Sequence, residues 1–332
     1  MNLIEILDKV NYYDVAKDEV IWKENGVLLN KKLLFNGDIV LVNTNERFVV
    51  IQTQSSGTII IDKATNNQYK VDKNGPIISN NMLLLGKWNE DFSVRILYAW
   101  DFIKDAKVWK KESYFGKPFL CEGNLFGSLK SKLFRIDPNT GESIWHLDLF
   151  KKNNSYTMNS ESTPIDIQEY IGLHNGCLYF KAGNKLIIGV SVESGKEKFN
   201  YEYTDEDVVL DNLCLDVDKG VIFSIGSSKY FELNLSSNLA KVHSLKEDAQ
   251  KYKIETTRLG SWEGNLIYFW EGGGNPKFGV FDRETKKIKF VQILEVNGYP
   301  AIKEIKHGQE KVYVLDGGNR LHVFEKEITP TK

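Results

Sequence analysis

Side chains capable of chemistry are few in this chain and lie far apart. His174 and Cys177 have the His-x-x-Cys spacing of two metal ligands across a turn. A second pair with ligand spacing is missing, and Cys177 begins an apolar segment typical of a core strand. We therefore interpret the two residues as a turn histidine and a core thiol, and we predict no metal site.

Nucleophilic catalysis has no supporting motif. Gly-x-Ser-x-Gly does not occur, and the other histidines are scattered along the chain at His146, His243, His307 and His322. Because no nucleophile accompanies a candidate base, we assign no catalytic residue. We expect a protein that is not an enzyme.

The three glycines at 272–274 suggest a phosphate-binding loop at first sight. Such a loop precedes a helix and usually contains Lys-Ser or Lys-Thr. Here the sequence Asn-Pro-Lys follows and leads into a strand. A hairpin loop is the better interpretation.

An acidic run begins at Glu202 and ends at Asp211. It lacks the ligand spacing and the glycine of a calcium-binding EF-hand. A solvated loop is the simpler interpretation, and contact with a partner is the alternative. Asp205, Glu206 and Asp207 are therefore candidate partner-binding residues.

The composition argues against several classes of protein. The 43 basic and 45 acidic residues are well mixed and give a formal charge of −2, so nothing indicates a nucleic-acid partner. No segment is long and apolar enough to span a membrane, and acids interrupt the apolar run at the N-terminus, unlike a secretory signal. The chain has an odd number of cysteines, and they are widely spaced: Cys121, Cys177 and Cys214. This pattern is typical of free thiols in a protein from a reduced compartment. We predict a soluble, cytoplasmic monomer.

One repeated motif predicts the elements that would position any site. Residues 136–145, Ile-Asp-Pro-Asn-Thr-Gly-Glu-Ser-Ile-Trp, are typical of a strand end, a tight turn and the start of a second strand. Asp137 can accept N–H bonds inside the turn, and Gly141 can supply a positive φ. Trp145 then places a large apolar side chain on the returning strand. Weaker copies begin at 13, 61, 100, 190, 233, 281 and 324.

The spacing of these copies predicts the architecture. They lie about 44 residues apart, which is the range of a four-stranded propeller blade or a solenoid repeat. The segments between them are apolar β-type runs with Gly, Asn and Asp turns. We predict an all-β fold, a single β-propeller of four-stranded antiparallel blades. Seven blades fit the count best; six and eight are alternatives, because residues 27–35 form an additional hairpin-like stretch.

The two ends of the chain are expected to share a blade. The last strands stop near Phe324 without an outer strand, and the N-terminal segment Val20-Ile21-Trp22 could supply it. Pairing of the N- and C-terminal strands would close the ring and remove open sheet edges. We thus assign residues 1–332 to one domain, with a lead-in at 1–12, blades at 13–328 and a tail at 329–332.

The form apolar-Asp-x-x-Thr-Gly-x-x-x-Trp resembles the repeat of the PQQ-type, or quinoprotein-like, β-propellers. Residues 136–145 match it closely, and residues 190–199 match it with Ser191 in place of Asp. The resemblance covers most of the chain and implies the fold rather than an activity. The superfamily contains quinoprotein dehydrogenases and also non-enzymatic members. The dehydrogenases hold their quinone beneath a disulfide of adjacent cysteines, which this sequence lacks, so the resemblance implies a non-enzymatic member without a cofactor.

Connection lengths suggest where a partner binds. In a blade with strands A to D, the D–A and B–C loops emerge on one face, and the A–B and C–D turns on the other. The long connections collect on the first face, in D–A loops at 150–169 and 246–257 and in B–C loops at 88–93 and 271–277. Five side chains on or near these loops are candidate anchors of a partner: Trp88, Tyr156, Met158, Trp262 and Trp270. Packing between blades is the alternative for the tryptophans.

We predict a non-catalytic, protein-binding propeller whose loop face engages another protein. A narrower hypothesis is an immunity or inhibitor protein that neutralises a toxin. The alternative is an enzyme or a small-ligand sensor with its site at the central channel. Clustered carboxylates or histidines with perturbed pKa values at the channel mouth would favour that alternative.

Overall fold

A computed structural model describes residues 1–326 except 56, 73–74, 76, 80, 89–94, 114–116, 130, 150–156, 159–160, 163–165, 184, 204–211, 227, 272–274 and 309. Within strands, it describes only the backbone at 78–79, 87–88, 95, 112–113, 117, 157–158 and 161–162. These residues form 34 strands and one helix, α1 (Lys246–Tyr252). No helix in this part of the chain is long and apolar enough to cross a membrane.

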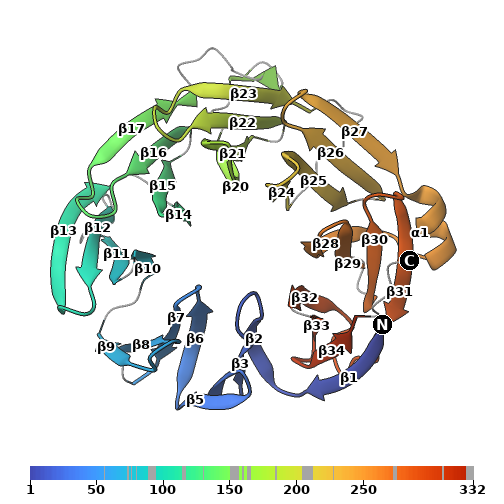
Figure 1. Cartoon of the computed structure of the whole chain (residues 1–332), viewed down its shortest axis with the longest axis horizontal. Helices are drawn as coiled ribbons and strands as arrows, with labels where there is room; N and C mark the ends of the chain where they lie inside the picture. The colour runs from blue at the N-terminus through green and yellow to red at the C-terminus, as the bar shows by residue number, and fades with distance from the viewer. Residues whose placement is uncertain are drawn as a thin grey trace. The chain divides into compact units, whose positions relative to one another are not determined.

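The fold is an all-β propeller of four-stranded antiparallel sheets, as the sequence predicts (Figure 1). In the first four complete blades the strands follow one another in chain order. They are β2 (Val10–Asp14), β3 (Val20–Lys23), β4 (Gly26–Leu29) and β5 (Lys32–Asn36); β6 (Ile39–Thr44), β7 (Phe48–Thr53), β8 (Gly57–Asp62) and β9 (Gln68–Val71); β10 (Ile77–Ser79), β11 (Met82–Trp88), β12 (Arg95–Asp101) and β13 (Ala106–Ser113); and β14 (Lys117–Cys121), β15 (Asn124–Leu129), β16 (Lys132–Ile136) and β17 (Ser143–Asp148).

The later blades repeat this order after a short ribbon of β18 (Thr157–Met158) and β19 (Glu161–Ser162). They are β20 (Ile167–His174), β21 (Cys177–Ala182), β22 (Leu186–Ser191) and β23 (Glu197–Glu202); β24 (Cys214–Asp216), β25 (Val221–Gly226), β26 (Lys229–Asn234) and β27 (Leu239–Ser244); β28 (Thr257–Glu263), β29 (Leu266–Glu271), β30 (Lys277–Asp282) and β31 (Lys287–Ile293); and β32 (Ile302–Gly308), β33 (Lys311–Asp316) and β34 (Leu321–Glu325), completed by β1 (Asn2–Leu7). One residue pair, Gly226 with Arg258, links β25 to β28.

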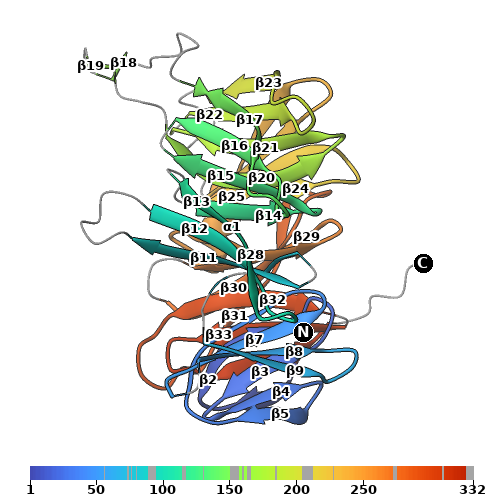
Figure 2. The ribbon, with the colours of Figure 1, turned by 90° about the vertical axis from the view of Figure 1, so that its left-hand side faces the viewer.

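The described residues therefore form eight blades, where the motif spacing favoured seven and left eight open. The difference arises near the N-terminus. The copy that begins at Tyr13 connects β2 to β3, an A–B connection, whereas the copies that begin at 61, 100, 136, 190, 233 and 281 connect strands C and D. Residues 27–35 are strands C and D of this first complete blade (Figure 2) rather than an additional hairpin.

Strand β1 closes the ring by pairing antiparallel with β34, from Asn2 opposite Glu325 to Leu7 opposite Leu321. The prediction that the N- and C-terminal strands share a blade is confirmed, but the closing strand is Asn2–Leu7 and not the segment at 20–22. Residues 1–12 are accordingly no lead-in, because they contain β1 and the start of β2. Leu7 packs beside a buried cluster that includes Tyr13 and Leu321, and this apolar contact favours the pairing.

The chain divides into two compact units. One contains Met1–Gln68, Ser224–Phe231 and Val242–Lys332, and the other contains Tyr69–Phe223 and Glu232–Lys241. Each unit has cores built mainly from B and C strands. In the second unit, for example, Phe126 of one blade packs in the same cluster as Phe180 and Ile188 of the next. Full burial of one such side chain contributes about 1.5–3 kcal/mol relative to exposure.

The first polar residue of the motif holds the turn between strands C and D in five of the blades. Its side-chain oxygen accepts N–H bonds from residues two or three positions later, which explains the preference for Asp or Asn. The residues concerned are Asp62, Asp101, Asp137, Asn234 and Asp282. The sequence predicted this role for Asp137.

In two copies of the motif, the tryptophan at the last position docks one blade on the next. Trp109 donates its Nε1–H to the carbonyl oxygen of Pro138 at 2.8 Å, and its ring lies against Gly141. Trp145 repeats the arrangement with Val192, at 2.7 Å, and Gly195. Each tryptophan therefore makes a hydrogen bond in addition to its apolar contacts. The sequence predicted only a large apolar side chain at this position.

Candidate partner-binding site

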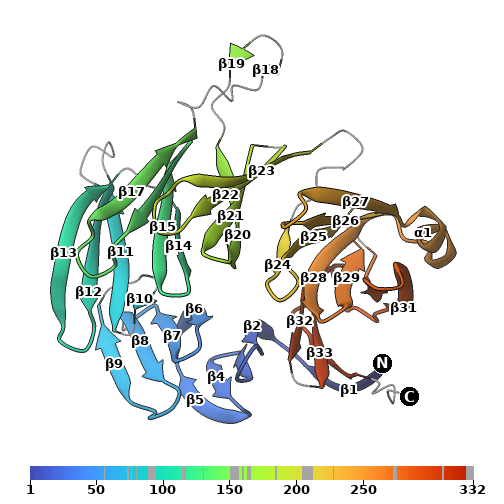
Figure 3. The ribbon, with the colours of Figure 1, turned by 45° about the horizontal axis from the view of Figure 1, so that its top comes forward.

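The segment at 246–257, predicted as a long D–A loop, begins with helix α1 (Figure 3). Its sequence, Lys-Glu-Asp-Ala-Gln-Lys-Tyr, contains mostly good helix formers. Glu247 and Asp248 lie in the first turn and Lys251 in the last turn, which suits the helix dipole. These signals were present in the sequence, but seven residues are too few for a clear helical period.

Helix α1 is attached to strand β31. The Asp248 carboxylate accepts the backbone N–H of Ile288 at 2.8 Å, and the Tyr252 hydroxyl reaches the carbonyl oxygen of the same residue at 3.5 Å. Leu245, Ala249 and Ile254 are buried beneath the helix, with at most 6% of each residue exposed. Both the polar and the apolar contacts therefore fix the helix on its blade.

Lys253 follows the last residue of the helix and caps it in a left-handed conformation with φ of 53°. Its N–H and that of Ile254 return to carbonyl oxygens of the last turn, as in a Schellman ending. The Lys277 ammonium group donates to the Lys253 carbonyl oxygen. The exit from α1 is thereby tied to the start of strand β30.

Glu271 is the carboxylate that holds this exit, and its side chain is fully buried. One oxygen accepts the backbone N–H of Glu255 at 3.0 Å and the side-chain amide of Asn275 at 3.4 Å. The Lys277 Nζ atom lies 3.2 Å from the other oxygen, close enough for an ion pair. The D–A segment at 246–257 and the B–C connection at 271–277 thus lie together, as predicted for one loop face.

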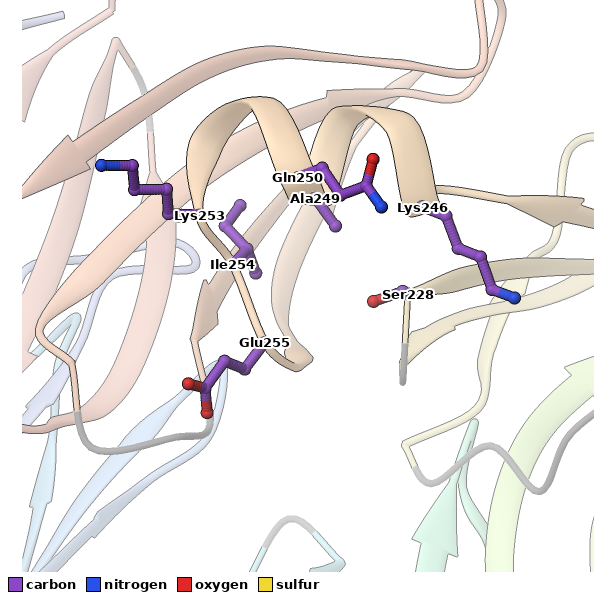
Figure 4. A pocket seen from close by; sticks show the side chains of 7 residues that line it. All are labelled: Ser228, Lys246, Ala249, Gln250, Lys253, Ile254 and Glu255. Carbon is purple, nitrogen blue, oxygen red and sulfur yellow. The ribbon is translucent and has the colours of Figure 1, made fainter.

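A cleft of about 320 Å³ opens beside α1 (Figure 4). It is lined by five polar residues and by two apolar ones: Ser228, Lys246, Gln250, Lys253 and Glu255, with Ala249 and Ile254. The Ser228 carbonyl oxygen accepts the N–H of Leu245 at 2.7 Å, which places the serine at the start of the helix. Such a lining can bind polar side chains by hydrogen bonds and charge, and also by aliphatic contact.

Lys246 and Lys253 extend from opposite ends of the helix in Figure 4, and Gln250 lies between them. The four long polar side chains of the lining, Lys246, Gln250, Lys253 and Glu255, belong to exposed residues. The sequence reasoning missed all of these residues individually. It identified only the length of the segment that contains them.

Two of the predicted anchors lie away from this cleft. Trp270 is half-buried on β29 and packs against a core cluster that includes Ile302 and Ile305. Trp262 lies near the A–B turn of β28, at the end of the blade opposite the loops, with the Arg283 guanidinium 5.6 Å from its ring. The packing alternative therefore describes Trp270. Trp262 lies at the opposite end of its blade, so the prediction that it lies near the loop face is wrong.

The other predicted contacts fall outside what the structure describes. Tyr156, Asp205, Glu206 and Asp207 lie outside the described residues. Trp88 and Met158 belong to β11 and β18, but their side chains are likewise outside the description. Their roles stay predictions.

His174 and Cys177 face each other across the turn between β20 and β21. The His174 Nε2 atom lies 2.9 Å from the side-chain amide of Asn175. Burial raises the pKa of the Cys177 thiol, and nearby Lys198 only partly offsets this effect. Within the described ranges, no group of three or more His, Cys, Asp or Glu residues could hold a metal ion.

A buried ionic group holds the B–C turn after β33. The Asp316 carboxylate lies 2.9 Å from His322 Nε2 and 3.1 Å from Arg320 Nε, and it accepts the Arg320 backbone N–H at 2.9 Å. Burial raises the pKa of Asp316, but these hydrogen bonds outweigh it and hold the pKa below its ordinary value. Because Asp316 and His322 are both buried, at 0% and 2% exposure, the group stabilises the turn instead of facing a substrate.

Comparison with known proteins shows the fold alone. No family model matches the chain, and no curated protein matches its sequence. Among solved structures, BamB from Moraxella catarrhalis is similar with a TM-score of 0.61 at 13% identity, over 97% of this chain and 99% of that one. Sqt1 from Saccharomyces cerevisiae gives 0.63 at 12%, and the computationally designed protein Ika8 gives 0.60 at 9%; each match covers 98% of both chains.

Proposed function

We propose that this chain is a non-catalytic, protein-binding propeller and that helix α1 and its cleft contact the partner. The observation that carries the proposal is the anchoring of the segment at 246–257. Asp248 and Glu271 fix its two ends to the blade, while Lys246, Gln250 and Lys253 stay exposed. A segment that is ordered before binding loses less conformational entropy when the partner arrives.

The charges of the cleft favour a polar partner surface. Two lysines and one glutamate in a lining with two apolar residues would pair with an acidic patch that has a small apolar centre. This arrangement matches the polar rim and apolar core of transient protein interfaces. We propose an acidic surface of another protein as the ligand.

Membership among the non-enzymatic PQQ-like propellers is part of the proposal. The docking of Trp109 and Trp145 on the turns of the next blade supports it, because these residues carry the sequence resemblance. Neutralisation of a toxin, a cytoplasmic location and a monomeric state also stay proposals. The alternative of an enzyme or sensor with a site at the central channel stays a prediction of the sequence.

Affinity capture from lysate of the native host tests the proposal, with bound proteins identified by mass spectrometry. The site variant combines Lys246→Glu and Lys253→Glu in the cleft. The matched control combines Lys17→Glu and Lys32→Glu, two exposed lysines outside helix α1 and its cleft that make the same change in net charge. We expect the wild type and the control to retain one stoichiometric partner and the site variant to retain at least about tenfold less.

Two results would contradict the proposal, and they are distinguishable. Equal capture by both variants would show that a partner exists but binds elsewhere. Absence of a partner from all three samples would remove the protein-binding function itself. Circular dichroism of each variant shows whether the fold is retained.

A further inference from the structure

A second cleft, of about 640 Å³, lies in the other compact unit. Its lining residues come from strands β16, β21, β22 and β23 and the turns beside them; Figure 1 shows these strands. The lining includes Arg135, Asn175, Cys177, Ser191, Glu193 and Lys198. We propose that this cleft binds an oxyanion, a carboxylate or a phosphate group, and that Arg135 is its main ligand. The proposal is independent of the function proposed for the α1 cleft.

Arg135 is a half-buried cation held by neutral acceptors. Its Nη1 donates to the carbonyl oxygen of Val192 at 3.1 Å, and its Nη2 donates to the Asn124 side-chain oxygen at 2.9 Å. In the part of the chain that the structure describes, the guanidinium has no carboxylate partner. A half-buried positive charge without a counter-charge attracts an anion strongly, because the surrounding dielectric is low.

The guanidinium also has donors to spare. An arginine side chain carries five N–H groups in a planar fork, and the hydrogen bonds of Arg135 within the described residues use two of them. The remaining N–H groups can donate to two oxygens of one anion, which is the geometry that carboxylates and phosphates share. The binding group is thus an oxyanion rather than a simple halide.

The position of Arg135 is fixed before any ligand binds. The Val192 carbonyl oxygen that accepts its hydrogen bond also accepts Nε1–H of Trp145 at 2.7 Å. Trp145 is in turn held against Gly195 of the same turn. Arg135 therefore loses little rotamer freedom on binding, which favours affinity.

The other charges of the cleft modulate this site. Lys198 adds a second positive charge, and Glu193 adds a negative one; both residues are exposed. Cys177 adds none, because burial raises the pKa of its thiol. Removal of the Glu193 charge should therefore strengthen anion binding, and removal of the Lys198 charge should weaken it.

Isothermal titration of the full chain with inorganic phosphate, and separately with glutarate, tests the proposal at constant ionic strength. We expect saturable 1:1 binding of at least one probe, weakened about 3-fold to 5-fold by Lys198→Gln and strengthened about 2-fold to 5-fold by Glu193→Gln. Lys196→Gln is the matched control, since Lys196 is exposed two positions earlier and lies outside the cleft. It should leave the affinity unchanged.

Arg135→Gln should reduce binding at least about tenfold. Because Arg135→Gln also loses the hydrogen bond to Val192, its thermal unfolding is compared with that of the wild type. If this variant fails to fold, Lys198→Gln and Glu193→Gln still test the proposal. If phosphate binds more tightly than glutarate, the ligand carries a phosphate group. If glutarate binds more tightly, the ligand carries a carboxylate. Binding that does not saturate for either probe, or equal effects of Lys198→Gln and Lys196→Gln, would overturn the proposal.

Discussion

At the scale of single residues, the two docked tryptophans explain why the motif requires glycine. Gly141 and Gly195 have φ values of 72° and 65°, a conformation that disfavours other residues. A Cβ atom at either position would also lie 2.7 Å from the ring of the docked tryptophan. Backbone conformation and close approach therefore select the same residue.

Gly141→Ala separates these two effects when it is compared with Gly123→Ala. Gly123 has nearly the same φ, 73°, but nothing lies within 4 Å of its Cβ position. We expect Gly123→Ala to cost about 1–2 kcal/mol for the left-handed conformation. Gly141→Ala should cost about 1–3 kcal/mol more, because the methyl group displaces Trp109. Urea unfolding of both variants measures the difference, and equal losses would show that the ring contact contributes nothing.

The pH dependence of stability tests the buried group at Asp316. Hydrogen bonds from His322 and Arg320 lower its pKa in the folded state, despite the opposing effect of burial. A group with a lowered folded pKa stabilises the protein above its unfolded pKa of about 3.9, and this stabilisation is lost as the pH falls through the folded pKa. Asp316→Asn should therefore cost about 1–3 kcal/mol at pH 7 and less at pH 3.

Urea unfolding at pH 7, 5, 4 and 3 checks this expectation. The exposed residue Asp8 provides the control, since Asp8→Asn should follow the wild type at every pH. If the wild type and Asp316→Asn differed by the same free energy at all four values, the carboxylate would not stabilise the fold through its charge.

At the scale of strands and turns, the motif predicted the C–D turns wherever an Asp or Asn begins them. It failed between β4 and β5, where Asn30 and Lys31 make a two-residue turn with positive φ values of 48° and 67°. Such a tight hairpin needs no capping carboxylate, so the sequence of this turn does not contain the motif. The count of blades therefore fell one short, because this turn was not recognised as a C–D connection.

The candidate site was only partly predictable for a different reason. The length of the segment at 246–257 marked it as a candidate binding loop, but its position depends on Glu271, which is distant in sequence. Nothing in the local sequence shows that the Glu271 carboxylate is buried and accepts the N–H of Glu255. The tryptophans were misassigned because aromatic side chains suit both interfaces and cores.

Glu271→Gln should loosen the exit from α1 while leaving the lining of the cleft intact. The substitution keeps the shape of the side chain but removes the negative charge beside Lys277. We expect a loss of about 1–3 kcal/mol and faster hydrogen exchange at the N–H groups of Ile254 and Glu255. Glu284→Gln, at an exposed glutamate in the turn after β30, is the control. Unchanged exchange at Glu255 would show that Glu271 does not hold the segment.

At the scale of the whole molecule, the repeated motif allowed the fold to be predicted from the sequence. Every blade uses the same alternation of apolar strands and turns, so the architecture follows from the period even where single copies are degraded. The function is harder to predict from the sequence, because each part of the surface occurs only once and has no copies to compare. Arg135 illustrates this: its sequence position indicates a strand, and only its neutral partners Val192 and Asn124 reveal an uncompensated charge.

Closure by β1 yields a prediction for the entire chain. Deletion of residues 1–7 leaves β34 as an edge and exposes the apolar cluster beside Leu7 and Leu321. We expect the melting temperature to fall by about 10 °C or more. A circular permutant restores the strand: the chain starts at Lys9, and a short turn replaces 327–332 and joins Lys326 to a C-terminal copy of residues 2–8. Because Asn2 lies opposite Glu325, this turn is an ordinary hairpin. The permutant should melt within about 3 °C of the wild type; a deletion without cost, or a permutant as unstable as the deletion, would show that β1 does not close the ring.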